Sequence, residues 1–95
     1  MSNNFNIEGF ETFEKAIVDF TATWCGPCKA LGPILDDISG TTDIKVFKID
    51  VDSNQGLAIE HGVRSIPTML YFKNGELINR TTGVKQKEEI IQMFN

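Results

Sequence analysis

The residues of this chain best suited to chemistry are its two cysteines, Cys25 and Cys28, which lie three positions apart. Thiols at this spacing can carry out reversible thiol–disulfide exchange, form a structural disulfide or supply half of a zinc site. A structural bridge here would close a loop of four residues, which is worth only about 2 kcal/mol in the chain-entropy model. A zinc site would need two more ligands, and the one other strong soft ligand is His61. Redox exchange, with no metal bound, is the leading interpretation.

The elements around the pair predict how it would be held. Residues 16–20 form a short apolar run, interrupted by Asp19, which is typical of a strand buried on both faces. A helix is predicted over residues 25–39, because apolar residues recur along one face. Cys25 would then lie at the helix N-terminus, where unpaired N–H groups and the helix dipole stabilise a thiolate. The apolar stripe of this helix consists of Leu31, Ile34, Leu35 and Ile38.

This placement predicts different roles for the two thiols. An ordinary thiol with a pKa of about 8.5 is only about 3% ionised at pH 7, whereas one with a pKa of about 7 is half ionised. Cys25 is therefore predicted to attack a substrate disulfide, and Cys28, with a less exposed sulfur, to resolve the mixed disulfide. Gly26 would let another chain approach closely, and Pro27 would restrain the loop within the first helical turn.

The remaining pattern predicts one α/β domain over residues 1–95. Gly40 should end the first helix and Gly62 a second, short one, while Asn74-Gly75 is a strong hairpin signal. The sheet should be mixed, with parallel strands at its centre and an antiparallel hairpin toward one edge. Further strands are expected at residues 3–7, 44–49, 68–72 and 77–82, and helices at 9–15, from 52 or 53 to 61, and at 85–94.

Composition limits the classes of function. Of the 95 residues, 41% are hydrophobic and 23% are charged, as in an ordinary globular domain. Nine Lys and Arg against 13 Asp and Glu give a net charge of -4, which disfavours a nucleic-acid partner. No membrane span is expected, and the N-terminus lacks the basic and apolar regions of a signal peptide. We therefore expect a cytoplasmic monomer.

The cysteine pair lies within a series of motifs that resembles the thioredoxin family. The motifs follow one another over nearly the whole chain, from Phe5 to Phe94, so they are far more specific than a lone Cys-x-x-Cys. The resemblance implies the thioredoxin fold with a shortened first helix. It also implies a protein-disulfide reductase that needs no bound cofactor, acts on disulfide-containing proteins and is recharged by a separate thioredoxin reductase. The similar segments are residues 18–29, 33–35, 48–52, 62–68, 72–75 and Gly83.

The resemblance also assigns a role to Asp19. A carboxyl buried in a strand should have a raised pKa, because desolvation penalises its charged form. By resemblance, Asp19 assists proton transfer to and from Cys28, through water. The alternative is a buried acid that is merely satisfied by neighbours. Lys48 on the adjacent strand would either be its ion partner or point to solvent.

A docking surface is implied as well. Pro67 matches the cis-proline of the family, which faces the cysteine pair and leaves Ile66 to pair with an extended substrate strand. An apolar rim around Cys25, fit for a partner protein, would consist of Trp24, Ile66, Gly83 and Val84. A position of Trp24 in the core is the alternative.

The chain differs from the family pattern in two respects, and its sequence leaves two alternative functions open. Thr21 stands where many family members carry an aromatic residue, and the segment before Val18 is several residues shorter than usual. A thiol oxidase or isomerase is one alternative function, and a non-catalytic binding subunit of a larger complex is the other. The Gly-Pro dipeptide between the cysteines resembles that of the reducing members and favours a reductase.

Overall fold

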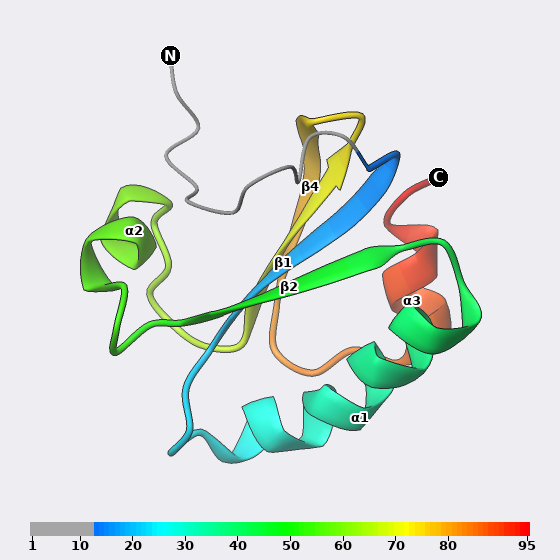
Figure 1. Ribbon diagram of the computed structural model, residues 1–95. Helices are drawn as coiled ribbons and strands as arrows, with labels where there is room; N and C mark the ends of the chain where they lie inside the picture. Colours follow the sequence, from blue (N-terminus) through cyan, green and yellow to red (C-terminus); the bar gives the residue numbers. More distant parts are fainter. Residues whose placement is uncertain (1–12) are drawn as a thin grey trace.

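The computed structural model describes residues 13–95 of the chain (Figure 1). The strand predicted at residues 3–7 lies outside this range. Of the helical turns predicted at 9–15, the described part is wrong, because Phe13 and Glu14 form a bend and Lys15 begins a strand. The described elements are, in chain order, β1 (Lys15–Thr21), α1 (Gly26–Thr41), β2 (Lys45–Asp50), α2 (Gln55–Glu60), β3 (Thr68–Lys73), β4 (Glu76–Thr82) and α3 (Lys87–Gln92).

The described strands form one mixed sheet in the order β2-β1-β3-β4. β1 runs parallel to β2, with α1 as the crossover, whereas β3 is antiparallel to both β1 and β4. The predicted mixed sheet is confirmed, although its parallel part is the single pair β1–β2. The β3–β4 hairpin turns at Asn74-Gly75, where both residues have positive φ, as the central residues of a type I′ turn must.

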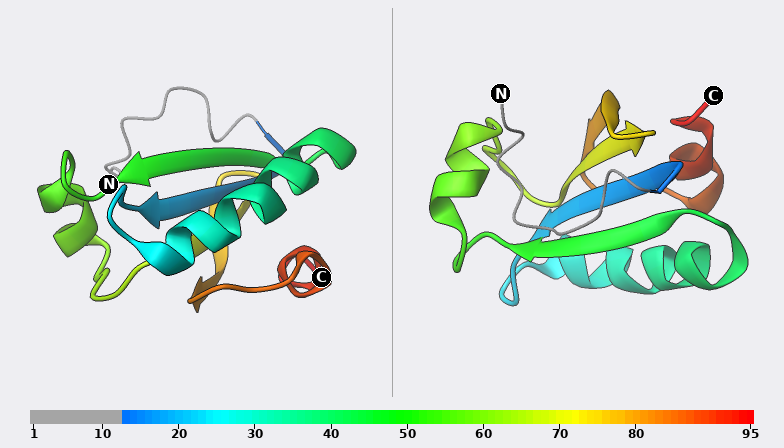
Figure 2. Two further views of the ribbon diagram at one scale, coloured as in Figure 1. Left: turned by 90° about the horizontal axis from the view of Figure 1, so that it is seen from below. Right: turned by 45° about the horizontal axis from the view of Figure 1, so that its top comes forward.

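Helices cover the two faces of the sheet unequally. Figure 2 shows α1 and α3 along one face and α2 at one end of the molecule. Between this face and the helices lies a buried cluster of Ile17, Leu31, Leu35, Ile38, Ile44, Met69, Tyr71, Ile90 and Phe94. Each such leucine or isoleucine contributes about 1.5–3 kcal/mol on burial, so α1 is firmly anchored. The opposite face, toward α2, carries Ala16, Val18, Phe20, Ile49, Ala58, Leu70 and Phe72.

The two glycines predicted to end helices behave differently. Gly40 does not end α1, which continues to Thr41. The backbone amide and the hydroxyl of Thr42 both donate to the carbonyl of Ile38, at 3.0 and 2.7 Å. Because a threonine satisfies this terminal carbonyl, no left-handed glycine is needed. Gly62, with a φ of 68°, does end the turn after α2, as predicted.

The starts of the two shorter helices are set by their caps. α3 begins at Lys87, two residues later than predicted, because Gln86 and Glu89 form a capping box in which the amide of Gln86 donates to Glu89 Oε1 at 2.9 Å; it ends at Gln92, two residues earlier than predicted. α2 begins at Gln55, and its N-cap residue is Asn54 rather than Asp52 or Ser53.

Candidate active site

The cysteine pair lies in the connection from β1 to α1. Cys25 is the N-cap residue of α1, and it forms a disulfide with Cys28 across 5.3 Å between the Cα atoms. The amide of Cys28 donates to Sγ of Cys25 at 3.1 Å, and Pro27 lies in the first turn, where it removes no helical hydrogen bond. The same amide can stabilise negative charge on this sulfur once the disulfide is reduced.

Both cysteines are buried in this oxidised form. Cys25 is 4% exposed and Cys28 is 7% exposed, so the predicted lower exposure of Cys28 is not found at the level of whole residues. The pair packs with Ala22, and Val51 and Ile66 cover this small cluster. Cys25 Sγ is distinguished by the hydrogen bond that it accepts from the amide of Cys28.

Asp19 lies in β1 on the face that α1 covers, since its side chain alternates with that of Val18 and shares the face of Ile17. It is 3% exposed, and its Oδ1 has no hydrogen-bond partner among the described residues. Burial raises the pKa of Asp19 from 3.8 to about 6, and the positive charge of Lys48 opposes this increase to a smaller extent. The predicted raised pKa is confirmed, so this carboxyl can change protonation close to neutral pH.

The side chain of Lys48 points to solvent instead of forming an ion pair with Asp19. It is the register partner of Asp19 on β2, yet its ammonium lies 3.3 Å from Oδ1 of Asp36 on α1. Both of these side chains are well exposed, which spares the ammonium the desolvation that an ion pair with Asp19 would require. Lys48 as the ion partner of Asp19 is therefore wrong, and only its longer-range charge reaches the acid.

The loop between α2 and β3 faces the disulfide. The Ile66–Pro67 peptide bond is cis, as the resemblance implied. The carbonyl oxygen of Ile66 lies 3.9 Å from Sγ of Cys25. Gly83, with a φ of 91°, donates its amide to the carbonyl of Pro67 at 2.8 Å. The α2–β3 loop therefore contacts the cysteine pair through Ile66 and is bonded to the residue after β4 through Pro67.

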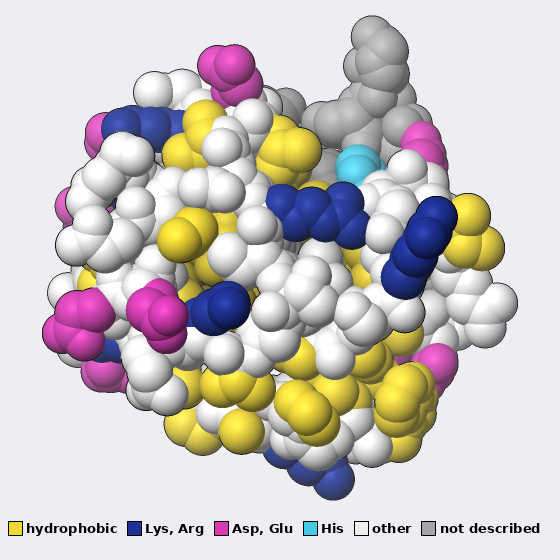
Figure 3. Space-filling model, turned by 180° about the vertical axis from the view of Figure 1, so that it is seen from behind, with side chains coloured by type: hydrophobic (Ala, Val, Ile, Leu, Met, Phe, Trp, Pro, Cys, Tyr) yellow, Lys and Arg dark blue, Asp and Glu magenta, His cyan; other side chains and the backbone are white. Residues whose placement is uncertain are grey.

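The predicted rim around the pair is partly exposed. Trp24 is 67% exposed, which rules out the core position, and Val84 is 36% exposed. The indole Nε1 of Trp24 donates to Oδ2 of Asp52 at 2.8 Å, a contact that the sequence did not predict. A Cβ at Gly26 would meet nothing within 4 Å, so the first turn of α1 is open to another chain. Figure 3 shows hydrophobic side chains gathered at the lower edge of the molecule seen from behind.

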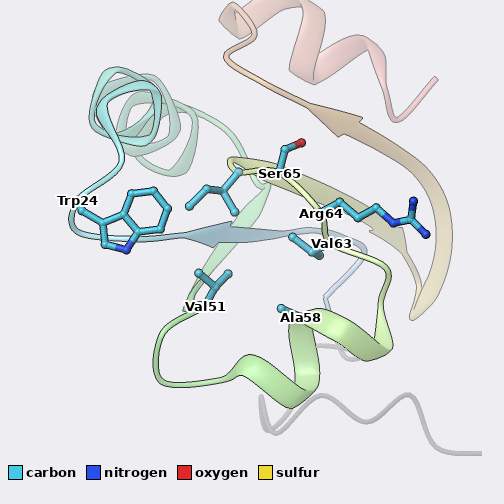
Figure 4. A pocket seen from close by; sticks show the side chains of 7 residues that line it. Trp24, Val51, Ala58, Val63, Arg64 and Ser65 are labelled. Carbon is cyan, nitrogen blue, oxygen red and sulfur yellow. The ribbon is translucent and has the colours of Figure 1, made fainter.

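A pocket of about 360 Å³ adjoins the pair on the side of α2 (Figure 4). Trp24 stands on one side of it, and the charged end of Arg64 points away from the indole. Most of its wall was missed by sequence reasoning, because these residues carry no reactive groups and come from four separate segments. The lining residues are Trp24, Val51, Ala58, Val63, Arg64, Ser65 and Ile66.

Between residues 13 and 95, no group of three or more His, Cys, Asp or Glu side chains is arranged to hold a metal ion. None of the helices in the same range is long and apolar enough to cross a membrane.

A cysteine pair at a helix N-terminus, opposite a loop with a cis-proline, defines a thiol–disulfide oxidoreductase. A family model described as Thioredoxin matches residues 1–95. The thioredoxin of Rickettsia conorii is 42% identical over 97 residues, covering 100% of this chain and 92% of the relative. That of Rickettsia typhi is 45% identical over 94 residues, covering 97% and 90%. The solved oxidised thioredoxin of Plasmodium falciparum has a TM-score of 0.76 and 32% identity, covering 88% of this chain and 84% of that one.

The chain therefore belongs to the thioredoxin family. Its fold is the thioredoxin fold, and a solved mutant thioredoxin from Halobacterium salinarum NRC-1 matches it with a TM-score of 0.82 and 37% identity, over 87% of this chain and 74% of that chain. The protein is a protein-disulfide oxidoreductase with a redox-active cysteine pair. Thioredoxins need no prosthetic cofactor, and the family generally works with a thioredoxin reductase and disulfide-containing substrates.

Proposed function

We propose that this protein reduces disulfides in other proteins, with Cys25 as the nucleophile. The observation that carries this assignment is the bond from the amide of Cys28 to Sγ of Cys25, at the N-terminus of a helix of 16 residues. When the pair is reduced, this amide and the helix dipole favour a thiolate on Cys25. Gly26 and Pro27 support this role by keeping the first turn open and restrained.

The reaction proceeds in two exchanges. The Cys25 thiolate attacks one sulfur of the substrate disulfide, forming a mixed disulfide and releasing the other sulfur as a thiolate, which takes up a proton. Cys28 then loses its proton and attacks Sγ of Cys25. This step forms the Cys25–Cys28 bond and releases the second substrate thiol. Two electrons pass from the pair to the substrate, and a separate thioredoxin reductase supplies two electrons to restore the dithiol.

Asp19 is the proposed proton acceptor for Cys28. It lies on the face of β1 beneath α1, it is buried, and its Oδ1 has no other hydrogen-bond partner in the described structure. A carboxylate with a pKa of about 6 is mostly ionised at pH 7, so it can take a proton from a thiol, directly or through water. Lys48 has only a supporting electrostatic role, because its charge favours the ionised form of Asp19.

The substrate is proposed to lie across the α2–β3 loop. Pro67 has no backbone N–H, so Ile66 is left to pair with an extended polypeptide next to the scissile disulfide. The exposed Trp24 and Val84 provide the apolar contact area. Gly83, whose amide donates to the carbonyl of Pro67, connects Val84 to the α2–β3 loop. We further propose that the 95-residue chain acts as one domain and a monomer in the cytoplasm, where a reductant can be kept reduced.

The test is reduction of insulin by dithiothreitol, followed by the turbidity of the released B chain. The wild-type protein should accelerate precipitation, and Cys25→Ser should abolish the acceleration. A matched control, Ser39→Ala on the exposed face of α1, should behave like the wild type. Absence of acceleration by the wild type, or full activity in Cys25→Ser, would contradict the proposal.

A further inference from the structure

Arg80, in β4, reaches the C-terminal end of α2. Its Nη1 donates to the carbonyl of His61 at 2.6 Å, and its Nη2 donates to the carbonyl of Gly62 at 2.7 Å. One guanidinium thus holds two consecutive main-chain carbonyls, a fork geometry that lysine cannot reproduce. The charge also lies at the negative end of the helix dipole.

These two carbonyls lie where the helix itself supplies no donors. α2 has only six residues, and its last turn is closed by the amides of His61, Gly62 and Val63, which bond back to carbonyls within the helix. The chain then turns through Gly62 in the left-handed conformation. A helix this short has little stability of its own, so its end depends on tertiary contacts. Ala58, Leu57 and Val63 pack against the sheet, and Arg80 supplies the hydrogen bonds to the two carbonyls at the helix end.

The segment that follows, residues 63–66, forms one wall of the pocket beside the cysteine pair. Its last carbonyl, that of Ile66, lies 3.9 Å from Sγ of Cys25. Beyond it, the carbonyl of Pro67 accepts from the amide of Gly83, the residue after β4. Hydrogen bonds from β4 and the residue after it therefore fix both ends of this wall: Arg80 donates just before it, and Gly83 donates just after it.

We propose that Arg80 is a positioning residue for the 63–66 wall, and that it sets how well an extended polypeptide substrate docks beside Cys25. The inference rests on the proposed function, because the wall matters only if a polypeptide lies on it. Arg80 is not catalytic, since it touches neither sulfur. A small disulfide that reaches Cys25 without contacting the wall should therefore not depend on Arg80.

This difference gives an experiment that separates positioning from general support of the fold. Arg80→Gln and Arg80→Lys are compared with the wild type, well below the melting temperature of each variant. The KM and kcat for insulin and the rate constant with 5,5′-dithiobis(2-nitrobenzoate) are measured. Lys87→Gln is the matched control, because Lys87 also joins two elements by polar contacts, to Asp37 and Thr41 at 3.0 Å each, away from the wall.

For Arg80→Gln we expect the KM for insulin to rise about three- to tenfold, as expected when charge-assisted bonds that orient a binding wall are lost. The kcat and the rate with the small disulfide should change less than about twofold, and Arg80→Lys should recover part of the loss. Lys87→Gln should leave the KM unchanged. Equal losses with both substrates, no loss with either, or the same rise in Lys87→Gln would overturn the proposal.

Hydrogen exchange tests the same inference without any substrate. The amide of Val63, which donates to the carbonyl of Ala58 at 2.9 Å, should exchange several-fold faster in Arg80→Gln. Unchanged exchange there would overturn the positioning role. A wild-type protein that fails to reduce insulin would count against the proposed function alone, because the exchange experiment would still report on Arg80.

Discussion

The disulfide lies between two walls that are built in different ways. On one side, the first turn of α1 carries Cys25 and Cys28 within four consecutive residues, and the bond between the Cys28 amide and Cys25 Sγ spans three positions. On the other side, the carbonyl of Ile66 is 41 positions from Cys25, and the contacts of Arg80 to the end of α2 span 18 and 19. The contacts on the α1 side join neighbouring residues, whereas those on the side of residues 63–66 join segments far apart in the sequence.

This difference separates chemistry from recognition. The α1 wall supplies the thiols, the helix dipole and a buried stripe that anchors the helix, all from one segment. The opposite wall supplies shape through the cis-proline loop, and it encloses the apolar pocket together with the exposed Trp24, which precedes Cys25. Substitutions in the second wall should therefore change the KM for proteins and leave the thiol chemistry intact.

The largest effect is expected for Cys28→Ser. Without a resolving thiol, Cys25 can attack but the mixed disulfide should persist, and multiple turnover should fall by roughly 10³-fold or more, as for other essential nucleophiles. Mass spectrometry of the variant after mixing with oxidised insulin should show a covalent adduct. The same treatment of Cys25→Ser, in which Cys28 is the one remaining thiol, should give none, and an adduct there would show that Cys25 is not the sole attacking residue.

A large effect on both rate and stability is expected for Asp19→Ala. The pKa of Asp19 is raised in the folded state, from 3.8 to about 6. The folded protein therefore binds the proton more tightly than the unfolded chain between these values. The stability of the oxidised protein should fall as pH rises from about 4 to 6 and then level off, for a total loss of about 3 kcal/mol.

Removing this carboxyl should reverse that loss. Asp19→Ala should be about 1–3 kcal/mol more stable than the wild type at pH 7, the cavity it leaves reducing the gain. Resolution of the mixed disulfide should slow by roughly 10²-fold, a usual contribution of a positioned general base. Urea unfolding at pH 4 and pH 7 and single-turnover release of product measure the two effects. Asp43→Ala, which removes an exposed acid away from Lys48, should leave both unchanged, and a less stable Asp19→Ala at pH 7 would contradict the burial of a charge.

A smaller effect is expected for Trp24→Ala. Because this side chain is 67% exposed, its loss should change the stability by less than about 0.5 kcal/mol. The KM for insulin should rise about three- to tenfold through lost contact area, with little change toward a small disulfide.

The smallest effect should come from Asp52→Ala, which removes only the acceptor of the Trp24 indole. A change in KM of less than about threefold is expected, consistent with one exposed hydrogen bond. Steady-state kinetics on both variants would order the two effects, and a larger effect of Asp52→Ala than of Trp24→Ala would show that Asp52 acts on something other than the indole.

Much of the fold could be predicted because its signals are local. The apolar run of β1, the stripe of α1 and the Asn74-Gly75 turn each follow from a few neighbouring residues, and each is confirmed. The prediction that Gly40 ends α1 is wrong because it also rested on a local signal: glycine often follows a helix, but here Thr42 satisfies the terminal carbonyl of Ile38. Lys48 was ambiguous because a strand residue in register with Asp19 can turn its long side chain to either partner, and the solvated contact with Asp36 costs less desolvation.

The sequence by itself determined where the chemistry lies. Two cysteines with Gly-Pro between them, after a strand and at the start of a predicted helix, specify a reactive pair through local geometry, whereas the proposed role of Asp19 as proton acceptor came from the family resemblance. Only the tertiary structure decided what surrounds that pair. The carbonyl of Ile66 and the pocket lie beside it, Trp24 donates a hydrogen bond to Asp52, and Arg80 donates to the carbonyls at the end of α2. The physical reason is that these contacts join segments whose spacing along the chain carries no periodic signal, so they form only when the sheet and its helices have packed.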